Sequence, residues 1–266
     1  MCGIAGYSLS ESSELDRTFA AQALLAGISE RGADAVGYAH RAPGRRVAVH
    51  KQRSGASALL EQIAIPATAS DVLVHVRDYT KGHPKIEANN HPIRHGAVVG
   101  VHNGIIFNDD ELLAGHDCAR REPGMTVDSE AIFAVAAHTD GDPEAFEALC
   151  GSFATAWLDE RRERSLFLAR GAGRPLWVGT GEDGVFFAST KLALEVLESY
   201  LRLELTKQEL DEGTLLEVSG GRKVVREAFE PNRAFSETPL PAVRAPREAA
   251  FCLARLATLA AAAAAA

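Results

Sequence analysis

Residues 2–9 read CGIAGYSL, a cysteine followed at once by an apolar stretch, 3–9, that predicts a short buried strand. If Met1 is removed, Cys2 carries a free α-amine, which titrates near pH ~7.7–8.0. Part of that amine is unprotonated near neutral pH, so one residue can supply both nucleophile and base. A cysteine close to a terminus is more often incidental, and only the rest of the sequence separates the two interpretations.

Outward from this strand, the apolar pattern predicts an α+β fold. Helices are expected at 14–29, 56–64, 129–138 and 142–150, and strands at 36–41, 46–51, 71–77, 97–102, 153–159, 165–170, 175–180, 185–189, 214–219 and 223–229. Residues 78–96 are polar and predict a long loop, a feature that is often functional. Many antiparallel strands with few inserted helices indicate two sheets packed face to face and covered by helices.

The composition excludes several classes of protein. The net charge is −8, and lysine and arginine form no block, so nucleic acid is not expected as a partner. No apolar run predicts a membrane span, and the N-terminus lacks the pattern of a signal peptide. The four cysteines, at 2, 118, 150 and 252, show no metal-ligand spacing, so no metal is expected. A reducing, cytoplasmic location fits them best.

An ordered set of short motifs follows Cys2 along the chain. It comprises CGIAG (2–6), RGAD (31–34), Gly37, HVR (75–77), Thr80, NHP (90–92), HNGII (102–106) and DSE (128–130), with weaker matches at Arg170, Pro175-Leu176, Ala188-Ser189 and Glu212-Gly213. With this set the sequence resembles the glutaminase domain of class II glutamine amidotransferases, which are N-terminal nucleophile hydrolases. The pattern is most similar to the glucosamine-6-phosphate synthase branch. The resemblance implies a four-layer αββα sandwich over residues 2–230, followed by an extended tail and a short C-terminal helix over 231–266.

The resemblance also implies a nucleophile and an oxyanion hole. Cys2 would attack the side-chain amide of glutamine, release ammonia and leave a γ-glutamyl thioester that water hydrolyses to glutamate, with no cofactor. The Asn103 side-chain amide and the Gly104 backbone N–H would stabilise the developing oxyanion. The alternative for Asn103-Gly104 is a simple hairpin turn. Apolar Ile105 and Ile106, which follow at once, weaken that alternative.

Substrate-binding roles fall by resemblance on four further residues. The planar guanidinium of Arg77 would hold the glutamine carboxylate, Thr80 would add a hydroxyl contact, and Asp128 would pair with the ammonium group. Asp128 also has the position of a helix N-cap, the commoner role of such a residue. His91 would position the loop over glutamine or contact the substrate, although a histidine on a surface loop is an equally good interpretation.

Arg31 and Asp34 would support the nucleophile, the alternative for Arg31 being an ordinary helix-end arginine. The sequence departs from the synthase branch at two loop positions, where Asp78 replaces an aromatic residue and Lys81 replaces a histidine. These departures leave glutamine hydrolysis intact and affect the expected coupling to an acceptor site.

Nothing after residue 230 predicts a synthase domain, so we expect a separate synthase subunit to receive the ammonia. Two other functions remain open. One is hydrolysis of another γ-glutamyl amide without ammonia transfer, since Arg77 and Asp128 fit any free glutamyl head. The other is a non-catalytic regulatory subunit that retains the fold.

Overall fold

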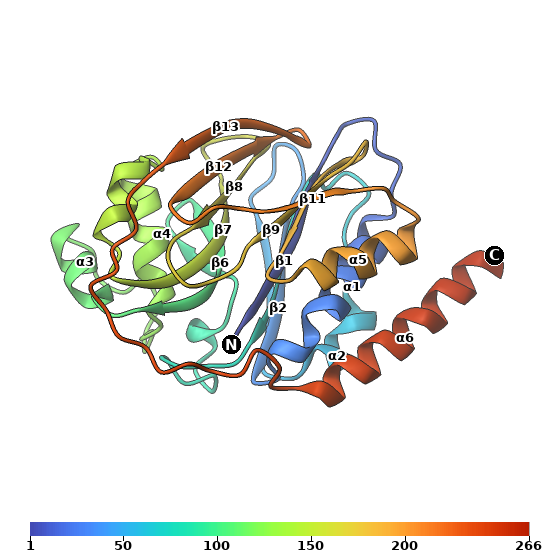
Figure 1. Ribbon diagram of the computed structural model, residues 1–266, viewed down its shortest axis with the longest axis horizontal. Coiled ribbons are helices and arrows are strands. Elements are labelled where there is room, and N and C mark those ends of the chain that lie inside the picture. The colour runs from blue at the N-terminus through green and yellow to red at the C-terminus, as the bar shows by residue number, and fades with distance from the viewer. Residues whose placement is uncertain (266) are drawn as a thin grey trace.

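The computed structural model describes residues 1–265 and contains two stacked β-sheets with helices on both outer faces (Figure 1). The seven-stranded sheet has the order β11-β9-β10-β1-β4-β2-β3, and the six-stranded sheet has the order β13-β12-β8-β7-β6-β5. All pairings between neighbouring strands are antiparallel. The predicted αββα sandwich of two antiparallel sheets flanked by helices is therefore confirmed.

The strands of the first sheet are β1 (Gly3–Leu9), β2 (Ala35–Arg41), β3 (Ala48–Gln52), β4 (Asp71–Arg77), β9 (Trp177–Thr180), β10 (Gly184–Ala188) and β11 (Thr206–Glu209). Those of the second are β5 (Ile93–His95), β6 (Val98–Ile106), β7 (Gly151–Asp159), β8 (Ser165–Arg170), β12 (Thr214–Ser219) and β13 (Arg222–Ala228). The α-helices are α1 (Arg17–Ile28), α2 (Ala56–Leu59), α3 (Asp109–Gly115), α4 (Ser129–His138), α5 (Lys191–Leu201) and α6 (Pro246–Ala265).

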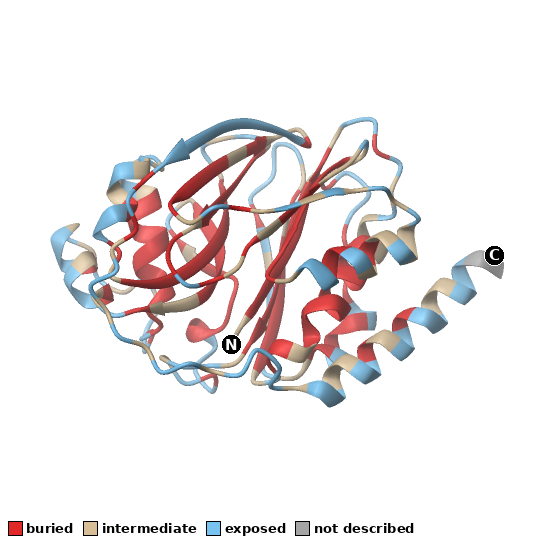
Figure 2. Ribbon diagram, viewed as in Figure 1, coloured by how far each residue is buried: buried red, intermediate tan, exposed pale blue. Residues whose placement is uncertain are grey.

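Three apolar layers hold these elements together. In β1 the side chains of Ala5, Tyr7 and Leu9 pack toward α1 and α5, whereas Ile4 lies in the layer between the two sheets. A third layer joins the second sheet to α4. Because β1 is covered on both faces, its sequence is almost continuously apolar, with Ser8 as the exception, rather than alternating. Figure 2 shows the buried residues concentrated in the central strands, while β13 is exposed along its whole length.

Several expected boundaries differ from the structure. Residues 78–96, expected as loop, contain β5, and the strand expected at 97–102 continues to Ile106. The helix expected at 142–150 is a 3-10 helix, Pro143–Ala148. The sequence did not predict α3, α5 or β11, although Thr190 caps α5 by accepting a hydrogen bond from the Ala193 backbone N–H.

The C-terminal segment runs along the edge of the sandwich at which the N-terminus lies (Figure 1). Residues 229–245 are extended, and the backbone N–H groups of Arg244 and Ala245 both donate to the Glu30 carbonyl at 2.8 Å. Helix α6 follows with 20 residues, longer than the short helix expected, and buries Cys252 and Leu256 in the layer of α1. Over residues 1–265, none of the helices has the length and apolar character needed to cross a membrane.

Candidate active site

The expected site residues meet at one end of the layer between the sheets. Gly3 of β1 pairs with Val76 of β4, which places Cys2 beside Arg77. Ile4 faces the inter-sheet layer, and Cys2 lies two residues earlier, on the same side of the chain. From the second sheet, β6 brings Val99 and Val101 into the same layer, so Asn103 continues that face.

The thiol of Cys2 is partly buried and donates to the backbone carbonyl of Asp78 at 3.4 Å. Burial raises the pKa of the Cys2 thiol, although the Asp78 carbonyl contact and the nearby Arg77 guanidinium oppose the increase. The thiol therefore needs a base to become a nucleophile. In this structure the α-amine belongs to Met1 and pairs with the Asp78 carboxylate, which also contacts Arg244 at 3.4 Å.

Arg31 and Asp34 both hold backbone around Cys2. The buried Arg31 donates from Nε to the Cys2 carbonyl at 2.8 Å. Asp34 accepts the Tyr79 backbone N–H at 3.0 Å and donates its own N–H to the Arg77 carbonyl at 3.0 Å. Glycine at 32 allows this close approach, because a Cβ there would lie 2.4 Å from the Arg77 carbonyl carbon.

Arg77 ends β4 with its guanidinium buried and committed to the loop that follows. It donates to the Asn90 side-chain oxygen at 2.6 Å, to the Lys81 carbonyl at 2.8 Å and to the Gly82 carbonyl. The loop is also fixed from outside, where Lys81 pairs with the buried Asp109 at 2.6 Å. In this conformation Arg77 holds the loop closed, and a carboxylate can reach its Nη2 only if these carbonyls move.

Asn103 and Gly104 lie inside β6 and not in a hairpin turn. Asn103 is fully buried, and within residues 1–265 neither Oδ1 nor Nδ2 meets a hydrogen-bond partner. Such an amide costs free energy unless a further group binds it. Gly104 has a φ of +150°, and a Cβ there would lie 1.9 Å from the Ser152 carbonyl oxygen, so only glycine fits.

Asp128 occupies the N-cap position of α4, but its side chain makes no capping hydrogen bond. Its Oδ2 instead accepts the Ile106 backbone N–H at 2.8 Å. Burial raises the pKa of Asp128 to about 6, against the opposing effect of that hydrogen bond. A buried carboxylate whose charge is costly is suited to pair with a cationic ligand group.

His91 is buried, contrary to the interpretation of a surface-loop histidine. Its ring stacks on His75 with centroids 4.1 Å apart, and its Nε2 lies 2.9 Å from the Ser129 hydroxyl. The same hydroxyl lies 2.8 Å from Nδ1 of His102, whose backbone carbonyl lies 3.1 Å from Nε2 of His75. Burial lowers the pKa of His75 and His102 to about 3 and that of His91 well below its usual value, so all three rings are neutral.

The sequence-based assignment of roles omitted His75, His102 and Ser129, although each lies inside one of the quoted motifs. Their pattern carries no separate signal, because the contact between them forms only when β4, β6 and α4 meet. The sequence indicates that these three residues belong to the site only by placing them next to, or in the same motifs as, residues 77, 103 and 128.

These groups line a very small pocket. It measures about 10 Å³ and is lined by Cys2, Arg77, Tyr79, Thr80, Lys81, His91, His102, Gly104, Val127, Asp128 and Ser129. That volume is about the size of a single water site. An amino acid can therefore enter only when the loop 78–82 moves outward, and Thr80 and Tyr79 on that loop are exposed.

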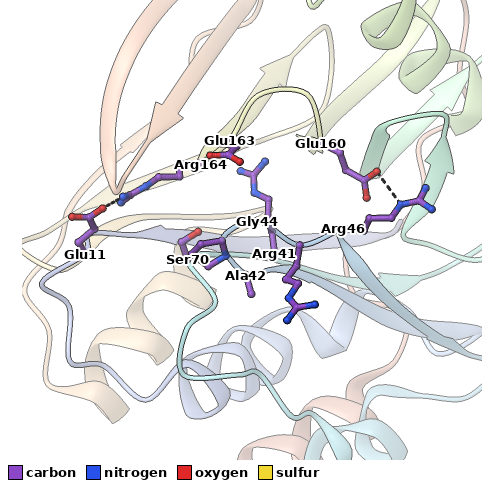
Figure 3. Close-up of a pocket in the computed structure, with 11 residues that line it drawn as sticks. Glu11, Arg41, Ala42, Gly44, Arg46, Ser70, Glu160, Glu163 and Arg164 are labelled. Carbon is purple, nitrogen blue, oxygen red and sulfur yellow. Dashed lines mark hydrogen bonds and ion pairs between the residues drawn. The ribbon is translucent and has the colours of Figure 1, made fainter.

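A larger hollow of about 380 Å³ lies at the other end of the same strands (Figure 3). The register of β2 and β4 pairs Ala35 with Arg77 at one end and Arg41 with Asp71 at the other, roughly 20 Å apart. Arg41 is bound to Asp71 at 2.9 Å, and Figure 3 shows Glu11 paired with Arg164 and Glu160 paired with Arg46. The hollow is thus separate from Cys2, and most of its charged groups are already paired.

Comparison with known proteins supports the assignment of the fold. A family model described as a glutamine amidotransferase domain matches residues 79–196. The glutamine–fructose-6-phosphate aminotransferase of Salmonella typhi is 32% identical over 239 residues, covering 82% of this chain and 36% of the relative. That of Helicobacter pylori is 34% identical over 208 residues, covering 71% and 32%. The chain spans about a third of the length of the curated relatives it matches.

Solved structures share the fold at low sequence identity. The glutamine phosphoribosylpyrophosphate amidotransferase of B. subtilis, complexed with ADP and GMP, has a TM-score of 0.64 and 15% identity. A structure described as the allosteric regulatory enzyme of purine biosynthesis has a TM-score of 0.67 and 17% identity. Each similarity covers 86% of this chain and 49% of the other.

Proposed function

This chain belongs to the class II glutamine amidotransferases, and from that premise we propose that it hydrolyses L-glutamine to L-glutamate and ammonia through a γ-glutamyl thioester on Cys2. One observation carries the proposal. Cys2, Arg77, Gly104 and Asp128 line a single small pocket at the end of the inter-sheet layer. A nucleophile, a cation, a backbone N–H donor and an anion are the groups that hydrolysis of a free glutamyl amide requires.

Glutamine would bind by its two charged α-substituents. The Arg77 guanidinium would exchange the Lys81 and Gly82 carbonyls for the substrate carboxylate, and Asp128 would pair with the substrate ammonium. The loop 78–82 would open to admit the substrate and close again over it. Binding energy spent on this loop orders the amide group against the thiol, which lowers the entropic part of the barrier.

The chemistry needs Cys2 as the first residue. After loss of Met1, the Cys2 α-amine takes the thiol proton, and the thiolate attacks the amide carbon of glutamine. The oxyanion would be held by the Asn103 amide and the Gly104 N–H, and Asn103 supports this role because its buried amide meets no partner within residues 1–265. Collapse breaks the C–N bond, and the ammonium group returns its proton to the leaving nitrogen, which departs as ammonia.

Deacylation would repeat these steps with water as the nucleophile. The α-amine removes a proton from water, hydroxide attacks the thioester carbon, and the C–S bond breaks to release glutamate. The proton then returns to the Cys2 sulfur. The neutral rings of His75, His91 and His102 would position α4 and the loop without adding positive charge near the amine.

Ammonia would pass to a synthase active site on a separate subunit. Residues 230–245 and α6 pack against the amidotransferase body, and Arg174 and Ser152 both bind Glu237 of this segment beside the N-terminus. This placement supports a contact surface for a partner near Cys2. Copurification from the native source, or stimulation of the glutaminase by a neighbouring protein, tests this part of the proposal, and a fully active, unregulated monomer without a partner contradicts it.

The central test is glutaminase activity of protein whose N-terminal mass shows loss of Met1. We expect Cys2→Ala to abolish the activity and Cys150→Ala, a partly buried cysteine elsewhere, to retain it. Labelling by an electrophilic glutamine analogue on Cys2 separates an enzyme from a non-catalytic subunit. Turnover of glutamine against other γ-glutamyl amides separates an amidotransferase from a general γ-glutamyl hydrolase.

A further inference from the structure

Three metal-binding side chains from three different elements converge on the helical face of the second sheet. They are His95 of β5, Cys118 in the segment after α3, and His138 at the end of α4. Their ligand atoms all lie within 4.8 Å of one another. We propose that they bind a divalent transition-metal ion of the zinc class at a site distinct from Cys2.

The hydrogen bonds of His138 leave the correct ring nitrogen available. Its Nδ1 lies 2.8 Å from the Ala134 carbonyl, which can only accept, so Nδ1 carries the proton. The lone pair is therefore on Nε2, which lies 3.4 Å from the Cys118 sulfur. His138 is exposed and Cys118 is half-buried, so an ion can reach both from solvent.

His95 is fixed in the same tautomer by two independent contacts. Its Nδ1 lies 3.2 Å from Glu130 Oε1, an oxygen that also accepts the Arg121 backbone N–H at 2.8 Å. Its Nε2 accepts the Arg121 side-chain Nε–H at 3.4 Å. The proton of His95 therefore faces Glu130, and the Nε2 lone pair becomes available to an ion when the Arg121 side chain moves away. A carboxylate behind a ligating histidine is the arrangement that orients imidazoles at metal sites.

The spacing of the ligand atoms suits a tetrahedral ion. Zinc bonds of about 2.3 Å to sulfur and about 2.0–2.1 Å to nitrogen place neighbouring ligand atoms roughly 3.3–3.6 Å apart. The Cys118–His138 contact already has this length, and the remaining atoms need to contract from at most 4.8 Å. One thiolate with two imidazoles selects zinc, copper or nickel over magnesium and calcium, and leaves one position for water.

The charges around the cluster are consistent with a cation. The buried Glu130 supplies negative charge, Cys118 would add a thiolate on binding the ion, and Glu130 Oε2 has only a 3.5 Å contact with Arg120. Arg121 is exposed, and its weak side-chain contact with His95 can be displaced into solvent. The ion would join the segment after α3 to both β5 and α4, so its expected effect is stabilising.

The test is a Co²⁺ and Zn²⁺ titration of full-length Cys2→Ala protein, because a mature N-terminal cysteine would itself chelate metal. We expect one ion per chain, with thiolate-to-cobalt charge-transfer absorption and a higher thermal midpoint. His138→Gln and Cys118→Ser should each remove the charge-transfer band, whereas Cys150→Ser should retain it. Glu130→Gln should weaken binding by about 10–100-fold.

The control for correct folding is thermal unfolding in the presence of a chelator. There His138→Gln is expected to have the same midpoint as its parent protein, because the His138 side chain is exposed. Absence of a cobalt–thiolate band in the parent protein overturns the proposal. So does a band that persists in both Cys118→Ser and His138→Gln. Because the readout is metal binding in a protein that lacks Cys2, a failure here leaves the proposed glutaminase function untouched.

Discussion

The Asp128 carboxylate accepts the backbone N–H of Ile106 at 2.8 Å and leaves its own helix uncapped. The contact ties the N-terminus of α4 to the strand that carries Asn103 and Gly104. Capping α4 would use the same oxygens in a different direction. The Asp128 side chain therefore does not cap α4, and its carboxylate lies at the small pocket beside Cys2.

Asp128→Asn should stabilise the fold at neutral pH. Burial raises the pKa of Asp128 to about 6, above its usual 3.8, so the folded state favours the protonated form. The favourable contribution is therefore present below pH ~4 and lost as pH rises through about 6. A shift of this size corresponds to on the order of 3 kcal/mol. Thermal midpoints of Asp128→Asn and wild type should differ most above pH 6 and converge toward pH 4.

An exposed aspartate, Asp110, provides the control for this prediction. Asp110 has a side chain that is 77% exposed, so Asp110→Asn should show no comparable gain at pH 7.5. A midpoint for Asp128→Asn below that of wild type at pH 7.5 contradicts the prediction, because it would mean that the charged form is favoured in the folded protein.

Glutamine affinity should fall as pH drops through about 6. In the proposed binding mode only the ionised Asp128 attracts the substrate ammonium, and burial raises the pKa of Asp128 to about 6. Calorimetry on Cys2→Ala protein isolates binding from the titration of the catalytic amine. Below pH 6 the affinity should fall by up to about tenfold per pH unit. The double variant Cys2→Ala/Asp128→Asn should bind glutamine more weakly and show no pH dependence of affinity in this range. If affinity falls with pH in the same way in both proteins, the pH dependence arises from a group other than Asp128.

Arg77→Lys should open the loop and weaken glutamine binding. The guanidinium spans Asn90, Lys81 and Gly82 at once, and a single ammonium cannot reproduce this planar set of contacts. We expect a rise in KM of about 10-fold or more, because a charged hydrogen-bond pair to the substrate is lost. Faster tryptic cleavage after Lys81 or Lys85 reports the opening. Arg46→Lys, at a side chain that is 81% exposed, serves as the control, and an unchanged KM in Arg77→Lys excludes the proposed carboxylate contact.

Much of the framework can be predicted from sequence because its elements have clear boundaries. The strands at 71–77, 165–170 and 214–219 and the helix at 129–138 have the predicted limits. Residues 191–201 form an amphipathic helix, but the sequence-based prediction assigned no element between residues 189 and 214. The short β5 has only three residues, too few for a periodic signal.

The residues of the candidate active site could be predicted only through the motifs. The proposed metal-binding cluster could not be predicted at all. His95, Cys118 and His138 lie about twenty residues apart in sequence, far from any metal-ligand spacing. Their convergence depends on how α3 and α4 cover the edge strand β5. In the same way, the sequence places Asn103 after a strand, whereas the structure places it inside β6, with its amide facing the inter-sheet layer.

Asn103→Ala should reduce catalysis without reducing stability. The Asn103 amide is fully buried, and within residues 1–265 it meets no hydrogen-bond partner, so removing it relieves a desolvation cost of about 1–3 kcal/mol. Loss of one oxyanion-hole donor lowers kcat by about 10²–10³. We therefore expect an unchanged or higher thermal midpoint, a KM close to that of wild type, and a large decrease in kcat. Thr155→Ala on the neighbouring strand is the matched control, because its buried hydroxyl donates to Val101 at 2.9 Å and its removal should lower the midpoint while kcat is retained. A destabilised Asn103→Ala protein with normal kcat would mean that the amide serves the fold, and the oxyanion would then have to be held by Gly104 alone.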